Sequence, residues 1–149
     1  MSHPALTVAD AVVAALNAAE FSVEFTAARR YVPRFDAEDG SDVQVQVVPR
    51  SDREGDDGTV GYDSREVVIQ IGIFKRLSGT IAGETAECDA VMDLCEEIRA
   101  ALNRARVGDS SEAVCVAVDH EPIYSVEDID ERRVLLTVPA FTFLIDVEV

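Results

Sequence analysis

The sequence predicts an α+β fold in which two helices pack on one face of a mainly antiparallel, sandwich-like β-sheet. Two segments repeat apolar residues at the helical spacing of three and four, whereas the segments between and after them alternate apolar and polar residues as strands do. The resulting order is one helix, three strands, a long helix and two or three closing strands. A chain of 149 residues, 48% of them hydrophobic, suits a single domain over residues 1–149.

The first predicted helix runs from Thr7 to about Ala19. Thr7 followed by Asp10 resembles a capping box in which Asp replaces the usual Glu. Apolar residues then recur at helical spacing: Val12, Val13, Leu16 and Ala19. Residues 21–26 alternate apolar and polar side chains, which predicts a half-buried strand. Pro33 is expected to end this strand or to lie at a sheet edge.

Two further strands are predicted on either side of an acidic, glycine-containing stretch. Residues 36–42 are rich in Asp and predict a turn. Residues 43–48 alternate Val and Gln up to Pro49, and residues 66–74 (EVVIQIGIF) carry the strongest strand signal in the chain. The stretch 50–65 is therefore predicted to contain a long hairpin loop.

A long amphipathic helix is predicted after Gly83, where the apolar period changes from 2 to 3.6. Acidic residues crowd its first half and arginines its last turns, as the helix dipole favours, and Gly108 is expected to close it. Its apolar stripe consists of Val91, Leu94, Cys95, Ile98, Ala101, Leu102 and Ala105. Residues 112–120 alternate again, residues 121–131 predict a turn or loop, and the closing stretch predicts one or two strands interrupted at Pro139.

The loop SDREGDDG is the best candidate for a metal site, but it departs from the calcium-binding pattern. An EF-hand loop needs oxygen ligands at positions 1, 3 and 5, Gly at position 6 and Glu at position 12. A start at Asp52 meets the first three positions, but Asp57 occupies the Gly position and Asp63 the Glu position. Because Arg53 and Arg65 would partly neutralise such a site and its flanks are strands, we predict no metal and no cofactor. We interpret residues 52–61 as a flexible arm that contacts another subunit.

Residues suited to catalysis are not arranged in a recognisable pattern. The chain contains no GxSxG, HExxH, Walker A or GxGxxG sequence. His3 is expected near a frayed terminus and His120 at a strand end, where Asp119 and Glu121 point to the opposite face. We therefore expect no enzyme, and only the surplus of acids favours a carboxylate hydrolase. The three cysteines form no CxxC pair and are expected to be small buried hydrophobes in a reduced, intracellular protein: Cys88, Cys95 and Cys115.

The charge of the chain is strongly negative. Asp and Glu number 29 against 13 Lys and Arg, which gives a net charge of −16. This balance argues against specific binding of nucleic-acid phosphates, which needs Lys and Arg to displace counterions. It suits a channel through which DNA slides without sticking, although it equally suits a protein that is merely kept in solution by its charge. No run of about 18 apolar residues predicts a membrane span.

Positive charge and aromatic rings concentrate in the segment AARRYVPRF. Arg combined with aromatic residues is typical of interface anchors, and an acidic surface on a second copy would complement it. The alternative is pairing within the chain, with Glu24, Asp36 and Glu38. The predicted subunit-contact residues, including three from the glycine-containing loop, are Arg29, Arg30, Tyr31, Arg34, Phe35, Arg53, Asp56 and Asp57.

The order of these segments resembles that of the tail terminator and tail completion proteins of long-tailed bacteriophages and prophages. The resemblance rests on the opening helix TVADAVVAALNAA, the segment EFTAARRYVPRF, the strand pair VQVQVV and EVVIQIGIF, the long helix AVMDLCEEIRAALNRA and the closing VLLTVPAFTFLIDVEV. It covers nearly the whole chain. This family has no invariant chemical motif, so the resemblance assigns no role to an individual residue.

The resemblance implies a structural virion protein that forms a homohexameric ring at the head-proximal end of the tail. Such a ring stops polymerisation of the tail tube and forms the surface for head–tail joining. It implies contacts with other copies of itself, with the tail tube protein and with a head-completion or connector protein, in the virion and in the host cytoplasm during assembly. DNA would pass through the ring without specific binding. The alternatives are a neighbouring neck, head-completion or tail tube protein, and, from another class, a small intracellular regulatory domain that binds a divalent cation or ligand.

Overall fold

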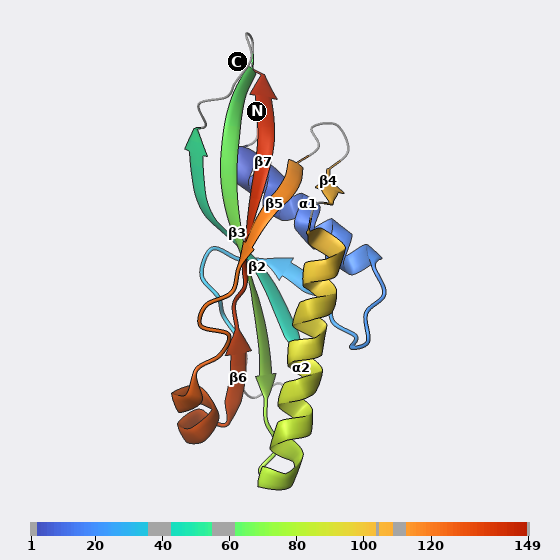
Figure 1. Ribbon diagram of the computed structural model, residues 1–149, viewed down its shortest axis with the longest axis vertical. Helices are drawn as coiled ribbons and strands as arrows, with labels where there is room; N and C mark the ends of the chain where they lie inside the picture. Colours follow the sequence, from blue (N-terminus) through green and yellow to red (C-terminus); the bar gives the residue numbers. More distant parts are fainter. Residues whose placement is uncertain (1–2, 36–42, 55–61, 104, 109–112, 149) are drawn as a thin grey trace.

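The computed structural model describes residues 3–35, 43–54, 62–103, 105–108 and 113–148, which form one layer of strands and one layer of helices (Figure 1). Seven strands make a single sheet in the order β1-β2-β3-β7-β5-β4, and β6 pairs with β3 beside the end of β7. Only the β1–β2 pairing is parallel. The predicted α+β class with a mainly antiparallel sheet is therefore confirmed.

The helices and strands follow the predicted order along the chain. They are α1 (Pro4–Ala18), β1 (Ala27–Arg29), β2 (Gln44–Glu54), β3 (Tyr62–Arg76), α2 (Ile81–Leu102), β4 (Arg106–Val107), β5 (Ala113–Asp119), the single-turn π-helix η1 (Asp128–Arg132), β6 (Val134–Thr137) and β7 (Ala140–Glu148). None of the helices in the described ranges is both long and apolar enough to cross a bilayer.

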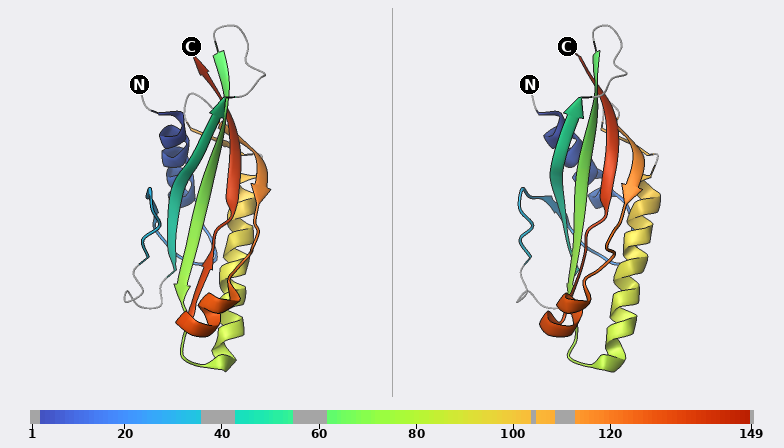
Figure 2. Two further views of the ribbon diagram at one scale, coloured as in Figure 1. Left: turned by 90° about the vertical axis from the view of Figure 1, so that its left-hand side faces the viewer. Right: turned by 60° about the vertical axis from the view of Figure 1, so that its left-hand side comes forward.

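Both long helices cover the same face of the sheet, which we call the inner face. Alternate β3 residues Val67, Ile69, Ile71 and Ile73 are completely buried, and they belong to one cluster with apolar residues of α1 and α2. Figure 2 shows α1 (blue) against the upper part of the strands and α2 (yellow) along their lower part. Full burial of each such side chain contributes about 1.5–3 kcal/mol, so this face dominates the stability of the fold.

The boundaries of both long helices differ from the prediction. The first helix begins at Pro4 because the His3 side chain caps it, accepting a hydrogen bond from the Ala5 amide at 3.1 Å. Thr7 therefore lies within the helix, and His3 is not in a frayed terminus. The second helix ends at Leu102 instead of at Gly108, because the Cys115 amide donates to the Ala105 carbonyl and Arg106 enters β4.

The strand predicted to start at Phe21 and to end by Pro33 exists only as the short β1, which begins at Ala27. Residues 21–26 are an irregular connection. The alternation of residues 21–26 has another cause. The Phe21 and Phe25 rings stack against the core with centroids 5.5 Å apart. Ser22 faces α2, and its amide donates a hydrogen bond to the Glu97 carboxylate at 2.9 Å. Partial burial of the aromatic rings therefore explains the pattern without a strand ladder.

Strands β2 and β3 are longer than predicted. Pro49 has no amide hydrogen to donate to the sheet, but it does not end β2. A β-bulge between Pro49 and Ser51 shifts the register, and pairing with β3 continues up to Glu54. Residues 50–54 and 62–65, assigned to a loop by the sequence, are therefore strand residues. The remaining part of the predicted arm, residues 55–61, lies outside the described residues.

Candidate assembly surface

The contact segment predicted from the sequence lies at the β1–β2 edge of the sheet. The short strand β1 pairs with residues 45–47 of β2, and the Arg30 amide extends this pairing by donating to the Val47 carbonyl at 2.9 Å. Asn17 of α1 holds the start of β1, because its side chain bonds the Ala27 amide at 2.8 Å and the Ala27 carbonyl at 3.1 Å. The segment is thus anchored at one end to both the helix and the sheet.

Arg29 is held within the molecule. Its guanidinium donates to the Asp10 carboxylate of α1 at 2.7 Å and lies 5.5 Å from the centroid of the Tyr31 ring. Interaction with Tyr31, together with the attraction of Asp10, raises the pKa of Arg29. Pairing within the chain is therefore real for Arg29, but its partner is Asp10 and not Glu24.

Phe35 crosses the other face of the sheet, which we call the outer face. Its ring stacks on Phe74 with centroids 5.0 Å apart and planes inclined by 9°. The ring occupies the space above Gly72, where an added Cβ would lie only 2.9 Å from Phe35 Cζ. Gln46 fixes the backbone beside this ring, because its buried side chain accepts from the Arg34 amide at 2.8 Å and donates to the Arg34 carbonyl. The glycine in the strong strand EVVIQIGIF is explained by this close approach.

The other predicted contact residues differ in their accessibility. Arg30, Tyr31 and Arg34 are exposed, and the Tyr31 residue is 67% accessible. The Arg53 side chain is 80% accessible and lies 3.9 Å from Glu66 across the β2–β3 pair. Asp56 and Asp57 lie outside the described residues. Four of the predicted contact residues are therefore exposed, and their role in assembly stays a prediction.

A hollow of about 400 Å³ opens beside this segment, between the start of α1 and the middle of β2. Its lining is His3, Ala5, Leu6, Tyr31, Pro49, Arg50, Ser51 and Asp52. Arg50 is exposed at the rim, and no carboxylate in the described residues lies within salt-bridge distance of Arg30, Arg34 or Arg50. The hollow combines apolar walls with one exposed arginine, Arg50, and the Asp52 carboxylate also belongs to its lining.

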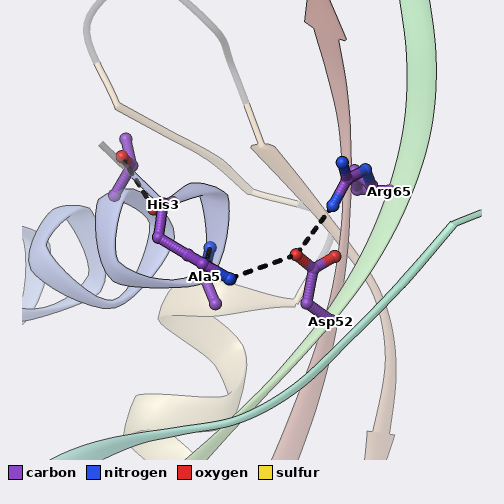
Figure 3. A network of polar contacts seen from close by, with 5 residues as sticks. His3, Ala5, Asp52 and Arg65 are labelled. Carbon is purple, nitrogen blue, oxygen red and sulfur yellow. Dashed lines mark hydrogen bonds and ion pairs between the residues drawn. The ribbon is translucent and has the colours of Figure 1, made fainter. Parts of the chain in front are cut away.

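Asp52, the first residue of the possible calcium pattern, is an ion-pair partner on the inner face (Figure 3). Its carboxylate accepts from Arg65 at 2.9 Å and lies 3.8 Å from His3 Nε2. The Asp52 side chain is 11% exposed, and its Oδ1 atom has no hydrogen-bond partner among the described residues. Because Arg65 already neutralises this carboxylate, the pair does not suit a cation. No group of three His, Cys, Asp or Glu side chains suited to a metal occurs in the part of the chain that the structure describes.

His120 and Cys95 meet below the end of β5. The His120 ring lies 3.8 Å from the Cys95 sulfur through Nδ1 and contacts the buried Thr137 hydroxyl through Nε2. Burial raises the pKa of Cys95 to about 11 and lowers the pKa of His120. A buried neutral thiol is a weak nucleophile, and Cys95 belongs to the core cluster of the fold.

The sequence reasoning passed over a second surface, the connection from β5 to η1. Within residues 119–131 there are six carboxylates and no Lys or Arg. Three apolar side chains in the same stretch are exposed: Ile123 at 46%, Tyr124 at 41% and Val126 at 69%. The prediction of a turn or loop over residues 121–131 did not include this signal, in which apolar side chains lie among carboxylates.

No protein-family model matches this chain, and no curated protein matches it. Chains of solved structures do match. One belongs to a structure described as "Virion of native gene transfer agent (GTA) particle"; it is 12% identical, and the alignment covers 97% of this chain and 95% of that chain with a TM-score of 0.44. A similarity at this level is distant and assigns neither a fold family nor a function.

Proposed function

We propose that this protein is a structural, non-enzymatic virion protein of the phage type, and specifically a tail terminator. In this role, identical subunits form a ring that caps the tail tube and provides the surface for head–tail joining. The element order supports the proposal, since an opening helix, a strand with an Arg-rich aromatic segment, a long hairpin, a long helix and closing strands succeed one another as in the resemblance described above.

The observation that carries the proposal is the division of the sheet into a sealed inner face and a partly open outer face. Both long helices lie on the inner face, whereas Val116 and Leu144 are 48% and 40% exposed on β5 and β7. We infer that this open face is covered on assembly, because these two exposed apolar side chains lie on the paired strands β5 and β7. The net charge of −16 agrees with a lumen through which DNA slides.

Sedimentation velocity and negative-stain images of the purified protein, alone and with the tail tube protein of the same particle, test this proposal. We expect rings of identical subunits, or rings that form on the end of the tube. A strict monomer under both conditions would contradict the proposal. Genes for a portal, a head-completion protein and a tail tube beside this gene would support the proposal independently. A gene order in which this gene takes the place of a neck-protein gene would instead favour the role of a neck protein in the same particle.

A further inference from the structure

We infer that the hollow beside α1 receives residues 123–126 of a second copy of this chain, so that subunits join head to tail. This inference rests on the proposed function and adds to it the two surfaces that meet. One surface is the basic edge, formed by residues 29–34 and 49–53 together with the start of α1. The other is the acidic segment, residues 119–131.

The basic edge offers both an opening and a charge. The hollow of about 400 Å³ is large enough for one aromatic side chain with a neighbouring aliphatic group, and Tyr31 forms one of its walls. Residues 29–34 and 49–53 contain five arginines and a single carboxylate, Asp52, which is paired with Arg65. In a chain with only 13 basic residues, this concentration defines one positive region.

The acidic segment offers matching projections. Ile123, Tyr124 and Val126 are each at least 41% exposed. Exposed carboxylates surround these side chains: Asp119, Glu121, Glu127, Asp130 and Glu131. Two arginines follow this segment. Arg132 lies 3.6 Å from Asp128 and therefore offsets one of its six carboxylates, whereas Arg133 donates to Glu84 of α2 at 2.7 Å.

The two surfaces lie at opposite edges of one sheet. The basic edge borders β1 and β2, which end the strand order on one side, whereas the acidic segment connects β5 and β6 on the other side of β3. Figure 2 shows the blue-green segment after β1 along one border and the orange segment descending from β5 toward η1 along the other. Contacts between different surfaces of identical subunits generate rings or open filaments, which is the geometry that a ring-forming subunit needs.

Charge selects this pairing over a two-fold one. If the basic edge met its own copy, arginine would face arginine, and the acidic segment would face carboxylates in the same way. Only the head-to-tail arrangement places opposite charges around the hollow. The Tyr124 ring is the natural anchor, because interface energy concentrates in aromatic side chains that enter a pocket surrounded by a polar rim.

An exchange of charges between two variants tests the inference. The first variant carries Arg30→Glu, Arg34→Glu and Arg50→Glu, and the second carries Glu127→Lys, Asp130→Lys and Glu131→Lys. We expect each variant alone to self-associate about 100-fold more weakly than the wild type at low salt, because like charges then face each other. When the two variants are mixed, every contact is again complementary, and we expect oligomers in which the variants alternate.

Matched controls keep the test independent of folding. The variant Asp89→Lys, Asp93→Lys, Glu96→Lys reverses three exposed charges on α2 and should assemble as the wild type does. Tyr124→Ala should weaken self-association at least tenfold, by roughly the contribution of one aromatic anchor, whereas Ile81→Ala on α2, at a residue that is 81% exposed and lies in neither surface, should not. Circular dichroism and urea unfolding confirm that each variant is folded.

The outcomes separate this inference from the proposed function. Restoration of oligomers only in the mixture supports the inference. If both reversed variants assemble normally, or if the folded variants remain monomers when mixed, the inference is overturned while the ring function stands. If the wild type is a monomer both alone and with the tail tube, the proposed function fails and the inference fails with it.

Discussion

The inner face of the sheet is apolar and buried, whereas its two edges are charged and exposed. On the inner face, Val67, Ile69, Ile71 and Ile73 are completely buried and contact helices. At the edges, Tyr31 is 67% exposed and follows two arginines, and Val126 is 69% exposed within a stretch of six carboxylates. The difference separates the residues that stabilise the fold from the surfaces that we propose for assembly. Substitutions can therefore change one property while the other is kept.

The largest expected effect is on the inner face. Phe141→Ala removes a completely buried ring from β7 and should lower the free energy of unfolding by about 3–5 kcal/mol. Urea unfolding followed by circular dichroism measures this change. Leu144→Ala on the same strand is the control, because its side chain is 40% exposed, and it should cost less than about 1 kcal/mol. Equal costs at both positions would contradict the separation of the faces.

A smaller effect is expected for the ion pair at the upper end of the inner face. Arg65→Met leaves the largely buried Asp52 carboxylate without its 2.9 Å partner and should cost about 1–3 kcal/mol. Arg53→Met removes an 80% exposed side chain at 3.9 Å from Glu66 and should change stability by less than about 0.5 kcal/mol. Chemical denaturation of both variants checks the difference. An Arg53 effect as large as that of Arg65 would place a stabilising contact on the outer face.

The close approach of Phe35 to Gly72 predicts an effect of about 1 kcal/mol. Gly72→Ala should displace the ring from Phe74, since the new Cβ would lie 2.9 Å from Phe35 Cζ. In a Phe35→Ala background the same change should be neutral or stabilising, because the space is then free. A double-mutant cycle measures the coupling. Additive effects would show that Phe35 does not cover this glycine in solution.

The smallest expected effect concerns His120 and pH. Burial lowers the pKa of His120 below its ordinary value of 6.5, with a further contribution from Arg99, whereas Glu96 and Asp119 act in the opposite direction. The unfolded chain therefore takes up the proton first. The contribution of His120 to stability is complete above pH 6.5 and declines as the pH falls from there through the folded-state pKa.

His120→Asn should remove this component of the pH dependence. The measurement is the difference in urea midpoint between wild type and variant at several pH values from 7.5 to about 5. The wild type should lose more stability than the variant across the window below pH 6.5. A difference that stays constant with pH would show that the imidazole titrates in the folded protein as it does in the unfolded chain.

The sequence was most informative where one face of an element is fully buried. The alternation in EVVIQIGIF and the stripe from Val91 to Leu102 predicted β3 and α2, because complete burial of one side imposes a strict period. Alternation misled at residues 21–26, where partly buried aromatic rings produce the same pattern in an irregular connection. Helix ends were displaced for local reasons that periodicity does not report, such as the cap formed by His3.

The candidate assembly surface was only half predictable. The Arg-rich segment stood out in an acidic chain, whereas the hollow beside it depends on α1 and β2 meeting in space. The sequence already indicated that Arg65 would partly neutralise a cation loop, and the structure adds that Arg65 pairs with Asp52 at 2.9 Å across the β2–β3 pair. The role that we propose for residues 119–131 depends on the sheet order, which places them on the other side of β3 from the arginines.

The most direct test of the head-to-tail contact is photo-cross-linking from Tyr31. The photoreactive amino acid p-benzoylphenylalanine replaces Tyr31, whose exposed side chain lines the hollow, and the cross-linked peptides of the assembled protein are identified by mass spectrometry. Cross-links between copies that join position 31 to residues 119–131 are the expected result. Cross-links that instead join position 31 to the outer-face residues around Leu144, or to position 31 of another copy, would contradict it.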